Sequence, residues 1–285
     1  MLGDRGAVMR RRAILVRLAA ALTVLAGPLA PAAAQLKSGD NPEASEIWQK
    51  VRASLFESRP ISPADDVLLL EAPARAEDAA IVPISIRTRF PQSASRYVDR
   101  LWLIIDNNPS PIAAVFRFTP DSGRADIETR VRVDEYTHVR AIAETNDGRL
   151  FMTTRFVKAS GGCSAPPSKD QQAALATLGK MKFRVEGAVD QDKPVLAQLM
   201  ISHPNNSGLA MDQSTRQFTP SHFVRKVEVS YAGKPVLSAD VDFSISENPN
   251  FRFYFVPRGA GELKAEVVDS NELRFESALK IQPSN

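Results

Sequence analysis

Apolar and polar residues alternate in short segments along most of the chain after residue 60. Residues 125–133 alternate cleanly, and residues 149–156 follow an Asn-Asp-Gly hairpin turn at 146–148. In the second part, residues 223–231 lead through an Ala-Gly turn at 232–233 into another apolar run. About seven such strands precede residue 160 and about seven follow residue 181, with few helices between them. The spacing predicts an all-β protein made of two antiparallel β-sandwiches in tandem.

Two helices are expected beside these strands. The first begins near Asn41 and Pro42, which favour the N-cap and the first turn of a helix. An apolar stripe over residues 47–55 follows at helical spacing, so this N-terminal helix is expected to dock on a sheet. The second helix, residues 168–180, opens with a Ser-x-x-Gln cap and is expected to connect the two sandwiches.

The first 34 residues have the pattern of an export signal. A basic stretch precedes an apolar segment at residues 18–26, and three alanines at 32–34 form a small-residue cleavage site before Gln35. The apolar segment is shorter than the roughly 20 residues that span a bilayer, so a cleaved signal is favoured over an anchor. The pair Arg11-Arg12 also resembles a twin-arginine signal, so Sec and twin-arginine export both stay open. We expect a periplasmic protein with no membrane span in the mature chain.

The signal segment also accounts for the basic composition of the chain. The whole chain has 36 Lys and Arg against 33 Asp and Glu. Residues 1–34 hold five Arg and one Asp, so the mature chain has 31 basic and 32 acidic residues, a net charge of −1. This balance gives no electrostatic reason to expect a nucleic acid or an anionic membrane as a partner.

The chain contains one cysteine, Cys163, in a segment of small residues. A free cysteine is usually a buried structural residue. Here Gly161 and Gly162 precede the sulfur and Pro166-Pro167 follow it, a composition that favours an exposed loop over a core strand. In an exported chain, a lone cysteine is either an intermolecular link or a free reactive thiol. We therefore expect an accessible thiol at Cys163.

Motifs for catalysis or metal binding are missing from the rest of the sequence. The histidines, His138, His203 and His222, are scattered, and their spacing is not that of a metal site. The sequence has no phosphate-binding loop, dinucleotide-binding fingerprint or nucleophile-elbow motif. We expect no catalytic residue, no metal and no cofactor. An enzyme with Cys163 as its nucleophile stays open as an alternative, and it would need a histidine folded against the thiol.

Several runs of the chain resemble the SoxY and SoxZ proteins of the thiosulfate-oxidising Sox system, joined head to tail. The runs similar to SoxY are residues 100–109, 129–140 and 158–163, and those similar to SoxZ are residues 203–208, 220–224, 233–237 and 246–253. After the export signal at 1–34, the resemblance divides the chain into three parts. These are a SoxY-like sandwich ending in a cysteine arm at 35–165, a helical linker at 166–180 and a SoxZ-like sandwich at 181–285.

This resemblance implies two immunoglobulin-like sandwiches without a catalytic centre. Cys163 would be the attachment site for sulfur intermediates, and Gly161 and Gly162 would be the flexible tether of a swinging arm. Partner enzymes, the Sox-type cytochromes and a hydrolase, would attach thiosulfate, release sulfate and oxidise the remaining sulfur. The implied function is a periplasmic, non-catalytic sulfur carrier.

The cysteine segment departs from the SoxY pattern in one respect. Ser164 and Ala165 stand where SoxY continues with glycines and ends, and here the chain runs on into the second half. A loop anchored at both ends reaches less far, because five residues span at most about 17 Å. Fused chains of this shape also resemble a SoxYZ-like group associated with periplasmic quinoprotein (PQQ-dependent) alcohol dehydrogenases. The alternative function is an accessory binding protein for such a dehydrogenase and its cytochrome c.

Overall fold

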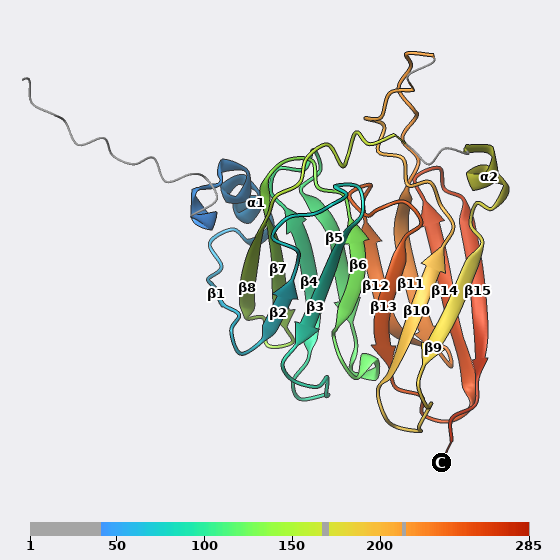
Figure 1. Ribbon diagram of the computed structural model, residues 1–285. Coiled ribbons are helices and arrows are strands. Elements are labelled where there is room, and N and C mark those ends of the chain that lie inside the picture. Colours follow the sequence, from blue (N-terminus) through green and yellow to red (C-terminus); the bar gives the residue numbers. More distant parts are fainter. Residues whose placement is uncertain (1–40, 167–170, 213–214, 285) are drawn as a thin grey trace, which may run out of the picture. The chain divides into compact units, whose positions relative to one another are not determined.

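Two large β-sheets lie face to face and enclose the main hydrophobic core (Figure 1). The computed structural model describes residues 41–166, 171–212 and 215–284. The predominance of strands confirms the expected all-β sandwich class. The expected signal peptide at 1–34 and the helix cap at Ser168 lie outside the described residues.

The strands of each sheet are given in spatial order. The nine-stranded sheet consists of β1 (Ile61–Pro63), β8 (Leu150–Val157), β7 (Thr137–Thr145), β4 (Val98–Ile105), β5 (Ile112–Phe118), β12 (Lys234–Val241), β11 (Val224–Tyr231), β14 (Gly261–Asp269) and β15 (Arg274–Ile281). The six-stranded sheet consists of β2 (Leu68–Glu71), β3 (Val82–Thr88), β6 (Ile127–Val131), β13 (Asn250–Phe255), β10 (Val195–Ile201) and β9 (Met181–Glu186).

Both sheets run without a break from the first half of the chain into the second. In the nine-stranded sheet, β5 pairs with β12, and Phe118 lies opposite Leu237. In the six-stranded sheet, β6 pairs with β13, where Glu128 and Arg252 face each other and form an ion pair at 2.7 Å. We call these two strand pairings the seam, because they join the two halves of the chain edge to edge.

The seam is a feature that the strand pattern alone does not predict. Tandem sandwiches are expected from the sequence, whereas the structure merges them into shared sheets. An unpaired edge strand exposes backbone donors and acceptors, and pairing one half with the other removes these edges. One strand also departs from the antiparallel pattern, since β1 pairs with β8 in parallel, with Ile61 opposite Leu150.

The core between the sheets is continuous across the seam as well. Phe116 on β5 and Phe251 on β13 are both buried, and their rings meet edge to face with centroids 6.2 Å apart. This contact links the two sheets and the two halves of the chain at once. An edge-to-face pair of this kind stabilises the fold beyond the burial of its area.

The N-terminal helix covers the outer face of the nine-stranded sheet in the first half. Asn41 caps a short 3-10 turn, η1 (Pro42–Ala44), and the α-helix α1 (Glu46–Phe56) begins only at Ser45, whose Oγ accepts the N–H of Trp48. The predicted start at Asn41 is therefore wrong by one turn. The predicted docking is confirmed, because Trp48 and Phe56 are fully buried in a second cluster with residues of β4, β7 and β8.

A buried ion pair supports this docked helix. Arg140 on β7 binds both carboxylate oxygens of Asp106 at 2.8 and 2.7 Å, and its guanidinium lies 4.4 Å from the ring centre of Trp48. It also donates to the carbonyl of Pro42. A buried charge is tolerated when its donors are satisfied in this way.

The remaining helices are short. The turn η2 (Pro120–Ser122) follows β5, and α2 (Gln171–Ala176) precedes β9, where a connecting helix is expected. Gly179 ends this segment with φ +75°, and a side chain at this position would overlap the ring of Phe275. In the part of the chain that the structure describes, no helix has the length and apolar character needed to cross a membrane.

Because the core crosses the seam, both halves should unfold in one transition. We expect Phe116→Ala to lower the free energy of unfolding by about 3–5 kcal/mol, the usual cost of a deleted buried ring. Urea unfolding is followed by tryptophan fluorescence, which reports on Trp48 and Trp102, and by far-UV circular dichroism, which reports on all strands. The control is Phe218→Ala, since that ring is 60% exposed. A separate dichroism transition that Phe116→Ala leaves unchanged would show that the halves are independent.

Candidate functional site at Cys163

The segment that carries Cys163 runs along the first half before it reaches the seam. After β8, Lys158 pairs with the backbone of residues 74–76. The N–H of Gly161 then donates to the carbonyl of Asp134 at 2.8 Å, and that of Gly162 donates to Val133 at 3.0 Å. These backbone bonds fix the segment against the chain that leaves β6.

The two glycines are required by close packing in this conformation. Gly161 has φ +79°, a backbone conformation that L side chains rarely adopt. A Cβ atom at Gly162 would lie 2.1 Å from the carbonyl oxygen of Ala79 and 2.7 Å from that of Val133. The sequence assigns these glycines to a flexible tether, whereas the structure uses them to press the loop against neighbouring backbone.

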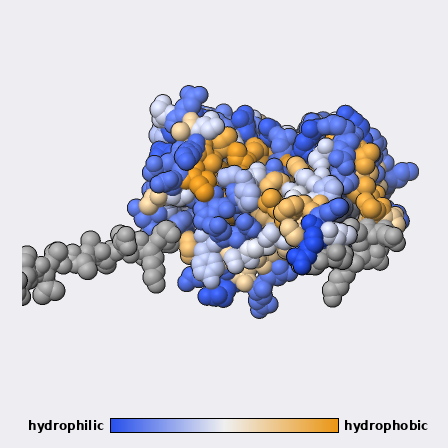
Figure 2. Space-filling view, turned by 90° about the horizontal axis from the view of Figure 1, so that it is seen from above, coloured by the Kyte–Doolittle hydropathy of each residue, from blue (hydrophilic) through white to orange (hydrophobic). Residues whose placement is uncertain are grey.

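The thiol of Cys163 is buried, so the expected exposure is wrong for this conformation. The residue is 1% exposed, in the segment after β8 at the end of the sheets that Figure 2 views from above. Its N–H donates to the Asp134 carboxylate at 3.2 Å, and its carbonyl accepts from Ser207 Oγ at 2.5 Å. Asp134 belongs to the first half and Ser207 to the second. The composition of the loop could not reveal this burial, because the second half provides part of the cover.

The surroundings of the thiol disfavour its ionised form. Burial is the main cause that raises the pKa of Cys163 to about 12, and the negative charges of Asp134 and Asp242 add to it. The positive charge of Arg132 acts in the opposite direction. Since the thiolate is the nucleophile and the thiol is not, Cys163 is chemically quiet in this state.

Arg132 is a buried cation that sequence reasoning did not single out. Its Nη1 donates to the carbonyls of Phe243 and Ile245 at 3.0 and 2.8 Å, so it crosses from the first half to the second. The pKa of Arg132 is lowered, mainly by burial. The electrostatic effects of Cys163 and Glu247 act in the opposite direction without cancelling it. Arg132 and Asp134 both lie within the SoxY-like run 129–140, which is the signal that could have found them.

Asn108 fixes the positions of these two charged residues. Its amide Nδ2 donates to the carbonyl of Arg132 at 2.8 Å and to Ser244 Oγ at 3.0 Å. Its Oδ1 accepts the N–H of Asp134 at 2.9 Å. One buried side chain therefore joins both halves behind the cysteine loop, and every polar group of its amide is used.

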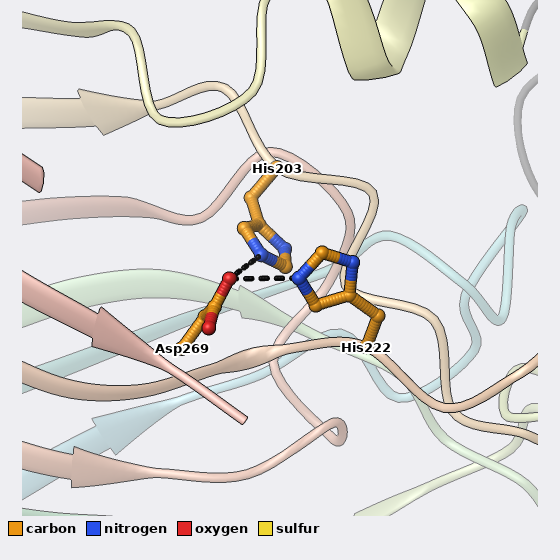
Figure 3. Close-up of side chains that lie close together, drawn as sticks. All are labelled: His203, His222 and Asp269. Atoms are coloured by element: carbon orange, nitrogen blue, oxygen red, sulfur yellow. Dashed lines mark hydrogen bonds and ion pairs between the residues drawn. The ribbon is translucent and has the colours of Figure 1, made fainter. Parts of the chain in front are cut away.

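The histidines are less scattered than their spacing in the sequence suggests. His203 and His222 approach Asp269 at the end of β14, with their Nε2 atoms 3.5 and 2.7 Å from Asp269 Oδ2 (Figure 3). His138 lies apart on β7, where its ring packs edge on against Phe156. The structure thus brings together two of the three histidines, and no sequence signal pointed to Asp269.

Within the described residues, the electrostatic groups found to act on Cys163 are Asp134, Arg132 and Asp242 rather than a histidine. Across residues 41–166, 171–212 and 215–284, the thiol-bearing residue is bonded to Asp134 and Ser207 and influenced by the charges of Arg132 and Asp242. A cysteine nucleophile needs a base within hydrogen-bond reach. The geometry therefore does not assemble the cysteine–histidine pair that the enzyme alternative requires.

Family models match both halves of the chain. The model of the sulfur oxidation protein SoxY matches residues 52–163, so that its last matched residue is Cys163. The model of the sulphur oxidation protein SoxZ matches residues 182–280. No curated protein matches the chain.

Solved structures show only distant likeness. The sulfur carrier protein SoxY from Chlorobium limicola f thiosulfatophilum is 24% identical, with 40% of this chain and 91% of that chain covered and a TM-score of 0.34. A superoxide reductase (neelaredoxin) from Ignicoccus hospitalis is 15% identical over 38% and 90% of the two chains, with a TM-score of 0.30. Fibronectin(III)-like modules of Clostridium thermocellum CbhA are 11% identical over 76% and 94%, with a TM-score of 0.22. Their TM-scores are too low for any of them to support a function.

The two family matches follow each other in the order expected from the sequence and together cover most of the chain. They meet at the cysteine loop and its connecting segment, with one match on each side of the seam. The chain therefore belongs to the SoxY and SoxZ families, as a fusion of both domains in one polypeptide.

Proposed function

We propose that this protein is a periplasmic, non-catalytic carrier that holds sulfur intermediates covalently on Cys163. The supporting observation is the position of Cys163: it is the last residue of the SoxY match, and its backbone carbonyl accepts a hydrogen bond from Ser207 of the SoxZ half. Membership of both families supports a carrier role in sulfur oxidation. Sox-type cytochromes and a sulfate-releasing hydrolase are the proposed partners, and the carrier itself needs no cofactor.

The chemistry asked of the chain is limited to one thiol. Attachment of thiosulfate forms an S–S bond between Cys163 Sγ and the outer sulfur of thiosulfate. This oxidation releases the thiol proton to water and passes two electrons to a cytochrome partner. Hydrolysis then adds water to the sulfonate group, releases sulfate and leaves a persulfide on Cys163. Both steps need the sulfur to be exposed, because attachment requires an accessible thiolate and hydrolysis requires that water and the hydrolase reach the sulfonate group.

The buried conformation is the resting state in this proposal. Opening the loop breaks the hydrogen bond that the Cys163 N–H donates to Asp134 and the one that its carbonyl accepts from Ser207, each with a net contribution of about 1 kcal/mol. Once in water, the thiol regains an ordinary pKa and can react. Gly161 and Gly162 then act as the hinge of the loop, because glycine tolerates the change of backbone angles that opening requires.

The double anchoring of the loop favours a second candidate. Ser164 and Ala165 replace the glycines of SoxY, and the chain continues into the second half, which shortens the reach of the arm. A carrier with a short reach fits a partner that docks over the seam, including a PQQ-dependent alcohol dehydrogenase or its cytochrome c. Neighbouring genes separate the candidates: sulfur-oxidation partners favour the carrier, and dehydrogenase partners favour the accessory protein.

The test of the carrier function is the intact mass of the protein isolated from the periplasm of cells oxidising thiosulfate. We expect mass increases that match sulfur or thiosulfonate units, that reductant removes and that Cys163→Ser abolishes. Purified protein alone should turn over no thiosulfate. A thiol that stays unmodified throughout growth on thiosulfate would contradict the carrier function.

The contact from Ser207 should control access to the thiol. Ser207→Ala removes one hydrogen bond of the closed loop, worth about 1 kcal/mol, and should speed alkylation of native Cys163 by about fivefold. The rate is measured with a maleimide under native conditions. Ser164→Ala is the matched control, because Ser164 Oγ donates to the carbonyl of Gly161 within the same loop. Equal rates in the two variants would show that the second half does not hold the loop closed.

The raised pKa of Cys163 should make the fold sensitive to alkaline pH. The folded value of about 12 exceeds the ordinary value of 9.0, so the unfolded chain loses the thiol proton first, and stability falls as pH rises above 9.0. Near pH ~10.5 the loss amounts to roughly 2 kcal/mol, at about 1.4 kcal/mol for each pH unit above the unfolded pKa. The free energy of unfolding in urea is measured for the wild type and for Cys163→Ser, once below pH 9.0 and once near pH ~10.5, and the difference between the two proteins isolates this effect. A pH dependence that is the same in both proteins would refute the assignment.

A further inference from the structure

Three side chains from separate parts of the second half converge on one point. His203 follows β10, His222 precedes β11, and Asp269 ends β14 (Figure 3). One ligand atom from each, a ring nitrogen of either histidine and a carboxylate oxygen, lies within 4.8 Å of the other two. Two imidazoles and a carboxylate form a donor set that suits zinc and related divalent transition metals.

The carboxylate is held so that one oxygen faces the histidines. Asp269 Oδ1 accepts the N–H groups of Asn271 and Leu273, both at 2.9 Å. Oδ2 is then directed to His222 at 2.7 Å and His203 at 3.5 Å. In metal sites, hydrogen bonds to the far side of a ligand fix its orientation in this manner.

His203 adds an independent reason to look for a ligand. Its side chain is 0% exposed, and within the described residues its Nε2 atom makes no hydrogen bond of good geometry. A buried polar atom without a partner is uncommon, because it loses its bonds to water without replacement. The His222 side chain is 13% exposed, so the point of convergence can be reached from solvent.

We propose that His203, His222 and Asp269 form a binding site for one divalent transition-metal ion, with Zn²⁺ as the best fit. Each donor would lie about 2.0–2.2 Å from the ion, and a water or an external ligand would complete the tetrahedron. The ion would replace the His222–Asp269 hydrogen bond. The distance between the two side chains would then increase by roughly half an ångström. The argument for this site does not rest on the sulfur chemistry proposed for Cys163.

Metal binding has a structural consequence at Asn205. Without metal, His203 Nδ1 accepts the N–H of Asn205 at 3.1 Å, so the ring carries its proton on Nε2. A neutral ring that binds metal through Nε2 carries the proton on Nδ1, which cannot face another donor. The Asn205 amide must therefore turn away when the ion binds. This rearrangement opposes binding and predicts a moderate affinity, with the change confined to the segment that leads to Ser207.

The experiment uses tag-free protein with Cys163→Ser, so that the thiol cannot act as a ligand. After treatment with chelator and dialysis, Zn²⁺ is titrated by calorimetry, and Co²⁺ is titrated by visible absorption. We expect one equivalent to bind with a dissociation constant in the micromolar range, the absorption of a four-coordinate Co²⁺ site, and a higher melting temperature in excess metal.

His222→Gln is the test variant, because its side chain is the least buried of the three. It should weaken Zn²⁺ binding at least about tenfold, as the loss of one ligand implies. His138→Gln on β7 is the matched control and should bind as the parent does. Circular dichroism and melting without metal check that both variants fold. Absence of saturable binding, or equal binding by His222→Gln and the parent, would overturn the proposal and leave a purely structural histidine–carboxylate cluster.

Discussion

The pairing of β5 with β12 and of β6 with β13 is the constraint on which the rest of this structure depends. It converts two sandwiches into two shared sheets and places the buried contact between Phe116 and Phe251 at their centre. It also brings the end of β6 beside the loops after β10 and β12. The cysteine loop is covered only because these three segments meet. The site is thus a property of the joined halves, since neither half has all the groups that close it.

Burial, together with the charges around Cys163, then determines the protonation state of the thiol. Arg132 is committed to two carbonyl oxygens of the second half, while Asp134 and Asp242 face the thiol with negative charge. In a medium of low polarity such charges act strongly, and the balance favours the protonated sulfur. A thiol that is buried and protonated resists unwanted disulfides. Closure therefore protects the sulfur, and reaction requires a change of conformation.

The sequence predicted the elements of the fold and singled out Cys163 as the candidate site residue. Alternating residues such as those at 125–133 identified strands, the stripe at 47–55 identified the docking helix, and the glycines drew attention to Cys163. The burial of Cys163 could not be predicted, since Ser207 lies 44 residues away in the sequence. The approach of His203 to Asp269 was hidden for the same reason. Local patterns report a residue's own backbone, whereas long-range pairing decides what covers it.

Fusion of the two domains has a physical effect on this loop. Cover over Cys163 needs Asp134 from one domain and Ser207 from the other, so separate chains would form it only after they associate. In one polypeptide the second domain is always near, and the effective concentration of its loop is high. The closed state therefore persists at any protein concentration. The same connection anchors the cysteine segment at both ends, so a partner of the proposed carrier would have to come to the seam to reach the sulfur. Because both domains line that seam, a partner that docks there contacts residues of both, and its specificity can depend on the pair.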